Sequence, residues 1–239
     1  SVLWRGVYAM SATPTLKLDW CSHAAAKYAV EHWHYSRTMP IGKLVKIGAW
    51  EEDIFIGVVL FARGNSPNLG KRYGVNMVQV CELVRIALTH HLAPVSRIGT
   101  IALQFLSRAN PGLRLVMSFA DPYHGHHGGI YQAMNWIYTG MSRPELQFLY
   151  KGEWTHRREI TSGAFGQMRH IQNRGVSLPK RLMPGKHRYL YPLDAAMSVQ
   201  IAPLAQPYPK RVTSILADAS AVQAEESGAA PTVTLLQKL

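Results

Sequence analysis

Two apolar runs joined by a helical segment constrain the fold of this chain more than any other feature. VCELVRIAL (residues 80–88) and LRLVMSFAD (113–121) are rich in β-branched and large apolar residues, as buried strands are. Between them, TIALQFLSRAN (100–110) carries apolar residues on one helical face. Two strands joined through a helix run parallel in one sheet and need a right-handed crossover. We therefore expect a central sheet that is at least partly parallel.

The residues before this unit predict a helix and a hairpin. Ser22 is a favoured N-cap residue, and HAAAKYAVEHW (23–33) follows it with apolar residues at helical spacing. Two β-rich runs, KLVKIGAW (43–50) and IFIGVVLFARG (54–64), flank a charged turn at 51–53, which is a hairpin signal.

Two further elements are predicted after residue 121. Pro122 ends the preceding strand, and residues 128–138 carry apolar side chains at the i, i+3, i+4, i+7 spacing of a helix. ELQFLYKG (145–152) is then expected to close the core as a fifth strand. This order predicts an α/β core over residues 1–152, with a mixed, partly parallel central sheet flanked by helices.

Composition limits the class of protein and of partner. A chain of 239 residues that is 47% hydrophobic can bury a sizeable core. Two cysteines, Cys21 and Cys81, predict neither a disulfide framework nor a zinc knuckle. No run of eighteen apolar residues occurs, so a membrane span is not expected. The formal charge of +12 favours a polyanionic partner, either nucleic acid or an anionic membrane surface.

The basic residues are concentrated after the predicted core. Aromatic side chains are interleaved with them, which suits phosphate contacts beside stacked bases, although a solvated charged face is the alternative. We expect residues 153–194 to be a basic DNA-contacting extension packed on the core, and 195–239 to be a weakly ordered or docking tail. The predicted DNA-binding residues are Arg157, Arg158, Arg169, Arg174, Lys180, Arg181, Lys186 and Arg188.

Two histidine clusters are candidates for a site. Asp121 stands at the carboxyl end of a predicted strand, where ligands bind in open α/β sheets. With His124, His126 and His127 it offers carboxylate and imidazole ligands for iron, manganese or zinc; the alternative is a helix-capping Asp121 with solvated histidines. The second cluster, EHWHYS (31–36), follows the first helix, whose terminus also favours histidine. The two clusters form one site only if that helix lies across the strand ends.

A third candidate lies at the start of the predicted crossover helix. PVSRIGTIAL (94–103) places Ser96 and Arg97 where backbone N–H groups bind phosphate readily, and a plain helix entry is the alternative.

Segments spread along the chain resemble the phage Mom DNA-modification proteins. They are HYSRTMPIGKLVKIGAWE, FIGVVLFARG, CELVRIALTHHLAPVSRI, LRLVMSFADP, GIYQAMNWIYTG and HRYLYPLD, and the resemblance as a whole spans roughly residues 28–195. Mom proteins are similar to divergent members of the Gcn5-related acetyltransferase (GNAT) fold. The resemblance therefore implies a GNAT-like core with a basic C-terminal extension.

The resemblance also implies an activity. Mom proteins convert adenine in DNA to N6-carbamoylmethyladenine, which protects phage DNA from host restriction. It implies an iron-dependent (Fe²⁺) transferase that uses a coenzyme-A-type or other unidentified carbamoylmethyl donor. The partner would be double-stranded DNA with a flipped adenine, for which Tyr138 or Trp136 are stacking candidates. A phage- or prophage-encoded protein would act in the host cytoplasm, and the resemblance leaves open whether it forms a dimer.

The resemblance further implies roles for particular residues. Arg85 would orient the substrate, and Tyr35 and Tyr131 would be either metal ligands or proton-handling groups. The full expected set is Tyr35, Arg85, Asp121 and Tyr131 as catalytic residues, His34, Asp121 and Tyr131 as metal ligands, and Ser96, Arg97 and Ser118 as cofactor-binding residues.

Two departures from the acetyltransferase pattern keep other functions open. The pyrophosphate-binding loop is irregular in VSRIGTIA, and Trp136 stands where the usual general-acid tyrosine would precede Gly140. The alternatives are a coenzyme-A-dependent acyltransferase and a non-catalytic DNA-binding module with structural histidines.

Overall fold

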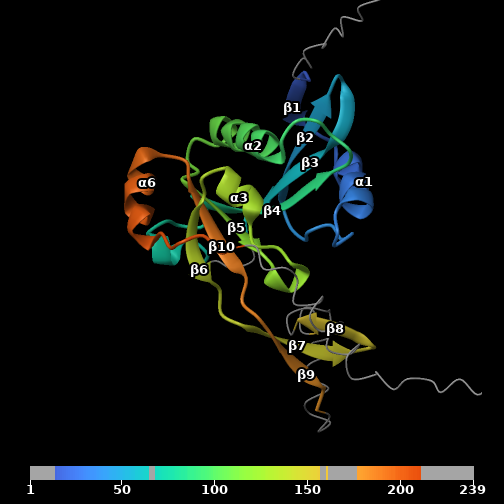
Figure 1. The fold of residues 1–239 in the computed structure, drawn as a ribbon, viewed down its shortest axis with the longest axis vertical. Coiled ribbons are helices and arrows are strands. Elements are labelled where there is room, and N and C mark those ends of the chain that lie inside the picture. Colours follow the sequence, from blue (N-terminus) through green and yellow to red (C-terminus); the bar gives the residue numbers. More distant parts are fainter. Residues whose placement is uncertain (1–13, 65–67, 157–159, 161–176, 211–239) are drawn as a thin grey trace, which may run out of the picture.

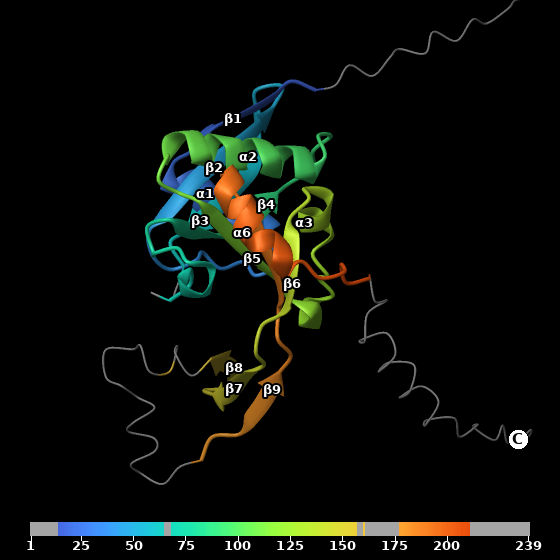
Figure 2. The ribbon, with the colours of Figure 1, turned by 90° about the vertical axis from the view of Figure 1, so that its left-hand side faces the viewer.

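The computed structural model describes residues 14–64, 68–156, 160 and 177–210 of the chain. Within these residues a seven-stranded main sheet and a three-stranded small sheet form, and Figures 1 and 2 both show the small sheet projecting from the main one. The main sheet has the spatial order β1 (Leu16–Trp20), β2 (Leu44–Glu51), β3 (Ile54–Ala62), β4 (Val80–Leu88), β5 (Leu115–Ala120), β10 (His187–Pro192) and β6 (Ile137–Met141). The small sheet has the order β8 (Glu153–His156), β7 (Glu145–Tyr150) and β9 (Lys180–Met183).

Helices cover both faces of the main sheet. Helix α1 packs on one face against β3 and β4, and α2 packs on the other through its apolar stripe. None of the described helices is long and apolar enough to cross a membrane. The helices are α1 (His23–Trp33), α2 (Val95–Ala109), α3 (Gly129–Ala133) and α6 (Ala195–Ile201), with short 3-10 turns η1 (Lys71–Tyr73), η2 (Pro122–His124) and η3 (Ala202–Leu204).

The parallel pair that the sequence predicts is β4 and β5. Among the described strands of the main sheet, every other neighbouring pair is antiparallel. Helix α2 connects the parallel strands, so the expected mixed, partly parallel sheet flanked by helices is confirmed. The β4–β5 ladder ends at Glu82 and Met117, although β4 continues to Leu88 and β5 to Ala120. The two strands therefore diverge and open a wedge in the sheet.

The local predictions for the first half of the chain are confirmed. Ser22 caps α1, with its hydroxyl accepting a hydrogen bond from the Ala25 N–H at 3.1 Å. The predicted hairpin is β2–β3, and the predicted strand 80–88 is β4.

The predicted helix 128–138 is wrong in its second half. Helix α3 ends at Ala133, and β6 begins at Ile137. Asn135 between them has a left-handed backbone with φ 58°, which a continuing helix does not allow. The Trp136 N–H then donates to the Tyr131 carbonyl at 2.9 Å and closes the turn. The apolar spacing of a helix persists across this turn because α3 and β6 both face the core.

The expected fifth core strand, 145–152, lies elsewhere. It becomes β7, which pairs with β8 and β9 in the small sheet. Its expected place in the core is taken by β10, which inserts between β5 and β6. The chain thus leaves the main sheet after β6, forms the small sheet, and returns.

The packed core continues past residue 195, because α6 covers the main sheet after its last strand. Met197 and Ile201 of α6 are fully buried in a cluster with Leu115 and Leu190. Of the expected tail, residues 211–239 lie outside the described residues.

Asp194 joins α6 to the sheet, and its removal should destabilise the fold. The Asp194 carboxylate accepts hydrogen bonds from the Arg114 guanidinium at 2.7 Å and from the Met197 N–H at 2.7 Å. These two bonds, with that from Arg114 the larger cause, lower the pKa of Asp194 to about 2. The lost helix cap alone should make Asp194→Ala less stable by about 1 kcal/mol in urea unfolding at neutral pH.

The dependence of the folding stability on pH follows from the lowered pKa of Asp194. The folded-state pKa of Asp194 is below its ordinary value, so its charge stabilises the fold above that value and loses this effect as pH falls toward about 2. Asp194→Asn keeps a capping oxygen, so it should lose less stability than Asp194→Ala at neutral pH. Equal stability of Asp194→Ala and the wild type would contradict the prediction.

Candidate functional site

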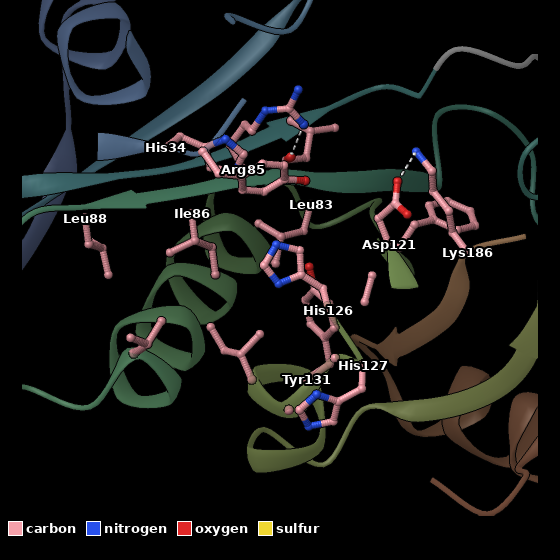
Figure 3. A pocket seen from close by; sticks show the side chains of 18 of the residues that line it. His34, Leu83, Arg85, Ile86, Leu88, Asp121, His126, His127, Tyr131 and Lys186 are labelled. Atoms are coloured by element: carbon pink, nitrogen blue, oxygen red, sulfur yellow. Dashed lines mark hydrogen bonds and ion pairs between the residues drawn. The ribbon is translucent and has the colours of Figure 1, made fainter. Parts of the chain in front are cut away.

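A cavity of about 750 Å³ occupies the wedge between β4 and β5 (Figure 3). Its walls come from the turn after α1, the second half of β4, the end of β5 with the following histidine loop, and the first residues of α2 and α3. The cavity thus lies at the carboxyl ends of the parallel strands, where the sequence placed a site.

A β-bulge shapes the β4 wall of this cavity. Leu83 pairs with Phe61 of β3, and Arg85 pairs with the preceding residue, Leu60, so Val84 is an extra residue in β4. Bulges redirect side chains and are frequent next to active sites.

The bulge brings Glu82 and Arg85 to the same face of the sheet. Their partners on β3 are Ala62 and Leu60, which are two residues apart and therefore share a face. That face is the one covered by α1, because Leu60 packs in a cluster with Ala26 of the helix. Without the bulge, residues three apart on a strand would point to opposite faces.

The two sides of β4 differ in polarity within the cavity. Figure 3 shows His34 and Arg85 on one side of the β4 ribbon, and Ile86 and Leu88 on the other. The side chains that β4 contributes to the cavity are therefore polar toward α1 and apolar toward α2.

The two histidine clusters meet across the mouth of the cavity. The Tyr35 ring centroid lies 4.9 Å from that of His126 and 5.3 Å from that of His124. It also lies 4.3 Å from the ring centroid of His34, the C-cap residue of α1. Helix α1 packs on β3 and β4, and residues of both clusters line the one cavity.

His34 is held as a neutral ring. Its Nδ1 accepts a hydrogen bond from the Ser36 N–H at 3.1 Å and lies 2.8 Å from the Ser36 hydroxyl. A backbone N–H can only donate, so the proton of neutral His34 is on Nε2. Burial, with the charges of Arg85 and His126, lowers the pKa of His34 to about 4.

Asp121 connects three parts of the site. One carboxylate oxygen accepts a hydrogen bond from the Tyr123 N–H at 3.0 Å and so caps η2. The other lies 3.4 Å from the ammonium of Lys186, just before β10. The capping role that was the alternative for Asp121 is therefore present, together with an ion pair to a distant segment.

Tyr131 reaches the wedge from α3. Its hydroxyl lies 2.7 Å from that of Ser118 on β5, and the Ser118 hydroxyl lies 2.8 Å from the Leu83 carbonyl oxygen on β4. These contacts connect α3, β5 and β4 where the two strands diverge. Burial raises the pKa of Tyr131 to about 12, so the phenol stays protonated at neutral pH.

Each of the expected iron ligands has a partner within the protein. Among the described residues, no three His, Cys, Asp or Glu side chains lie close enough together to hold a metal ion. Nδ1 of His34 already accepts from Ser36, which leaves the proton on the nitrogen that would face a metal. Asp121 is paired with Lys186, and Tyr131 with Ser118. This arrangement does not fit a metal site, and the iron requirement stays a prediction.

The expected cofactor residues lie at one edge of the cavity. Val95, the first residue of α2, contributes to the wall, whereas Ser96 and Arg97 after it do not. Ser118 is buried in β5 and bound to Leu83 and Tyr131.

The expected DNA-binding residues divide into two groups. Arg157, Arg158, Arg169 and Arg174 lie outside the described residues. Of the others, Lys180 is exposed on β9, while Lys186 pairs with Asp121. Arg181 donates twice to Gln147 and stacks over the Trp154 ring at 4.6 Å, and Arg188 donates twice to Thr139.

The two aromatic residues expected to stack on a flipped base are not available for it. Trp136 is 0% exposed and Tyr138 is 7% exposed, because the turn at Asn135 directs this segment into the core. Tyr35 at the cavity mouth is 58% exposed. It is the better candidate for stacking.

Glu82 is a site residue that the sequence analysis missed. It lines the cavity, and burial raises its pKa, opposed by the charges of Lys186 and Arg85. The available signal was an acidic residue inside an otherwise apolar strand, VCELVRIAL. Its meaning depends on the bulge, which the sequence does not reveal.

Comparisons with known proteins give relatives of the chain. It is 30% identical over 154 residues to the methylcarbamoylase mom of Escherichia phage Mu, and the match spans 62% of each protein. A solved structure of FeeM, an N-acyl amino acid synthase from uncultured soil microbes, is similar with a TM-score of 0.45 and 10% identity, covering 81% of this chain and 98% of that one. A putative acetyltransferase from Acinetobacter baylyi ADP1 is similar with a TM-score of 0.43 and 10% identity, covering 84% of this chain and 100% of that one.

The match to a protein family covers more of the chain than the match to the phage Mu protein does. Residues 15–210 match the Mom protein family, and this range includes every described element from β1 to η3. The chain therefore belongs to the Mom protein family.

Proposed function

We propose that this chain is a transferase that modifies adenine in phage DNA to N6-carbamoylmethyladenine and so protects the DNA from host restriction. The observation that carries the proposal is the family match over residues 15–210, since the phage Mu relative is a methylcarbamoylase. The polar cavity between β4 and β5 supports it, because it brings His34, Tyr35, Arg85, Asp121 and Tyr131 around one space.

The reaction makes specific demands on this space. The lone pair of the adenine N6 is delocalised into the ring, so the amino group is a poor nucleophile. The site must therefore hold the amino edge in a fixed orientation and keep water away from an activated donor. Tyr131 stays protonated and His34 stays neutral at neutral pH, and Arg85 lines the same cavity with its guanidinium. We assign the donor to the apolar side of the cavity, toward α2.

Access to the cavity requires a base outside the duplex. An adenine N6 inside stacked DNA cannot reach the wedge, so the target must be flipped or single-stranded. Tyr35 provides an exposed aromatic ring at the mouth, on which a base can stack. The formal charge of +12 favours the approach of DNA. Lys180 and the arginines of the basic extension belong to the proposed DNA surface.

Nucleoside mass spectrometry tests the proposal directly. The chain should be expressed with a plasmid in iron-replete cells, and the plasmid should become resistant to some restriction enzymes. Its hydrolysate should contain an adenosine heavier by the mass of one CH2CONH2 group replacing hydrogen. Cells carrying the empty vector are the control.

Two outcomes would contradict this function. Unmodified nucleosides from cells that contain the soluble protein would exclude adenine modification. DNA binding that weakens steeply with salt, without a covalent product, would instead favour the DNA-binding module.

A further inference from the structure

Glu82 and Arg85 present an unpaired acceptor and an unpaired donor beside each other. Arg85 donates from one terminal nitrogen to the Val84 carbonyl at 2.7 Å, but its Nε is buried and has no partner among the described residues. The Glu82 carboxylate forms neither a hydrogen bond nor an ion pair with any residue in the described part of the chain. Both side chains line the cavity, and the second terminal nitrogen of Arg85 has no hydrogen bond within the described part of the chain. Such a pair at the wall of a cavity is suited to a ligand that satisfies both groups.

The charges around this pair favour a neutral ligand. Glu82 and Asp121 bring two carboxylates to the cavity wall, and Arg85 and Lys186 bring two cations. A phosphate held by Arg85 would face the Glu82 carboxylate on the same face of β4. The ligand of this pair must therefore carry a hydrogen-bond donor next to an acceptor, without a net charge.

We propose that Glu82 and Arg85 hold the amino edge of the target adenine, with Glu82 accepting from the N6 amino group and the second terminal nitrogen of Arg85 donating to an adjacent ring nitrogen. This inference rests on the proposed function and names the contacts that select the base. Adenine presents an amino donor beside a ring-nitrogen acceptor, which is complementary to the pair. Guanine and hypoxanthine present a carbonyl oxygen at the same position, and that oxygen would face the Glu82 carboxylate.

The same contact favours the chemistry at N6. A carboxylate that accepts a hydrogen bond from an amino group shifts electron density toward its nitrogen. This partly opposes the delocalisation of the lone pair into the adenine ring. Glu82 would thus both select the base and orient its amino group for the transfer.

Binding to duplexes with one unpaired purine opposite an abasic site tests this inference. Such a purine is easily extruded, so its contacts dominate the differences in affinity. The wild-type chain should bind the adenine duplex about tenfold or more tightly than the hypoxanthine duplex. Glu82→Gln should reduce this preference to about twofold, because the glutamine amide can rotate and donate to the hypoxanthine oxygen.

Glu31→Gln is the matched control for Glu82→Gln. Glu31 lies on the surface of α1, where it forms an exposed ion pair with Lys27 at 3.7 Å. Exposed pairs contribute little to stability, so this variant should keep the full preference for adenine. A Glu82→Gln chain that retains the wild-type preference overturns the inference.

The wild-type chain supplies a second measurement that needs no variant. Purine without the amino group should bind about tenfold more weakly than adenine. Equal binding of the two duplexes overturns the inference even where Glu82→Gln does not fold. These are binding assays without a donor, so a chain that selects adenine but forms no product would overturn only the proposed function.

Discussion

Asp121→Asn should lower the modified fraction of plasmid adenine by about a hundredfold or more, the loss that a displacement of about 1 Å in an active site can cause. Asp121 ties the end of β5 to η2 through the Tyr123 N–H and to the segment before β10 through Lys186. Asparagine keeps an oxygen for the Tyr123 N–H but loses the charge that attracts Lys186. Nucleoside mass spectrometry of plasmid DNA from cells expressing each variant measures the effect.

Metal analysis separates two reasons for this loss. If Asp121 is an iron ligand, the purified wild-type chain contains iron and Asp121→Asn does not. If Asp121 acts through its ion pair, Lys186→Met reproduces the loss of modification and leaves the metal content of the two chains equal. Iron retained by Asp121→Asn removes Asp121 from the expected ligands.

Asp19→Asn is the control for a general effect of charge removal. Asp19 lies on β1 and forms a surface ion pair with Lys17 at 3.9 Å, away from the cavity. It should leave the modified fraction unchanged. Modification by Asp121→Asn at the wild-type level would contradict the role given to Asp121.

The sequence predicts those parts of the fold that local patterns determine. The hairpin β2–β3 follows from two β-rich runs around a charged turn, and the parallel pair β4–β5 follows from the intervening helix. The position of Asp121 at the end of its strand was also predicted from a local pattern, the apolar run that precedes it. In each case the residues that decide the structure are near one another in the chain.

The place of β10 could not be predicted in this way. HRYLYP (187–192) follows β9 and a basic stretch, and its partners β5 and β6 lie 46 or more residues earlier. Its register is set by packing, because Tyr189 and Leu190 are both fully buried on opposite faces of the sheet. A strand buried on both faces lacks the alternation that marks a half-buried strand.

The candidate site shows the same limit at the level of single residues. Strict alternation along VCELVRIAL places Glu82 and Arg85 on opposite faces. The bulge at Val84 reverses this, and only pairing with β3 reveals the bulge. The histidine loop was visible in the sequence, but its contact with Tyr35 depends on the position of α1.

Gly128→Ala should destabilise the chain by about 3 kcal/mol, of which about 1–2 kcal/mol is left-handed backbone strain and the rest is overpacking, and it should displace the histidine loop. Gly128 has φ +84°, and a Cβ there would collide with two ring carbons and the hydroxyl oxygen of Tyr189. Tyr189 cannot move aside, because it is fully buried and its hydroxyl donates to the His127 carbonyl at 2.6 Å. The loop would have to move instead, so the modified fraction should also fall by about a hundredfold.

Gly125→Ala in the same loop isolates the cause. Gly125 also has a left-handed backbone, with φ +72°, but a Cβ there meets no atom within 4 Å. Both variants bear the backbone strain of about 1–2 kcal/mol, and only Gly128→Ala adds the collision with Tyr189. Urea unfolding should therefore rank Gly125→Ala between Gly128→Ala and the wild type, with modification by Gly125→Ala largely retained. Equal losses of stability and of modification in the two variants would show that backbone strain alone causes them. The close contact of Gly128 with Tyr189 would then not be what positions the histidine loop.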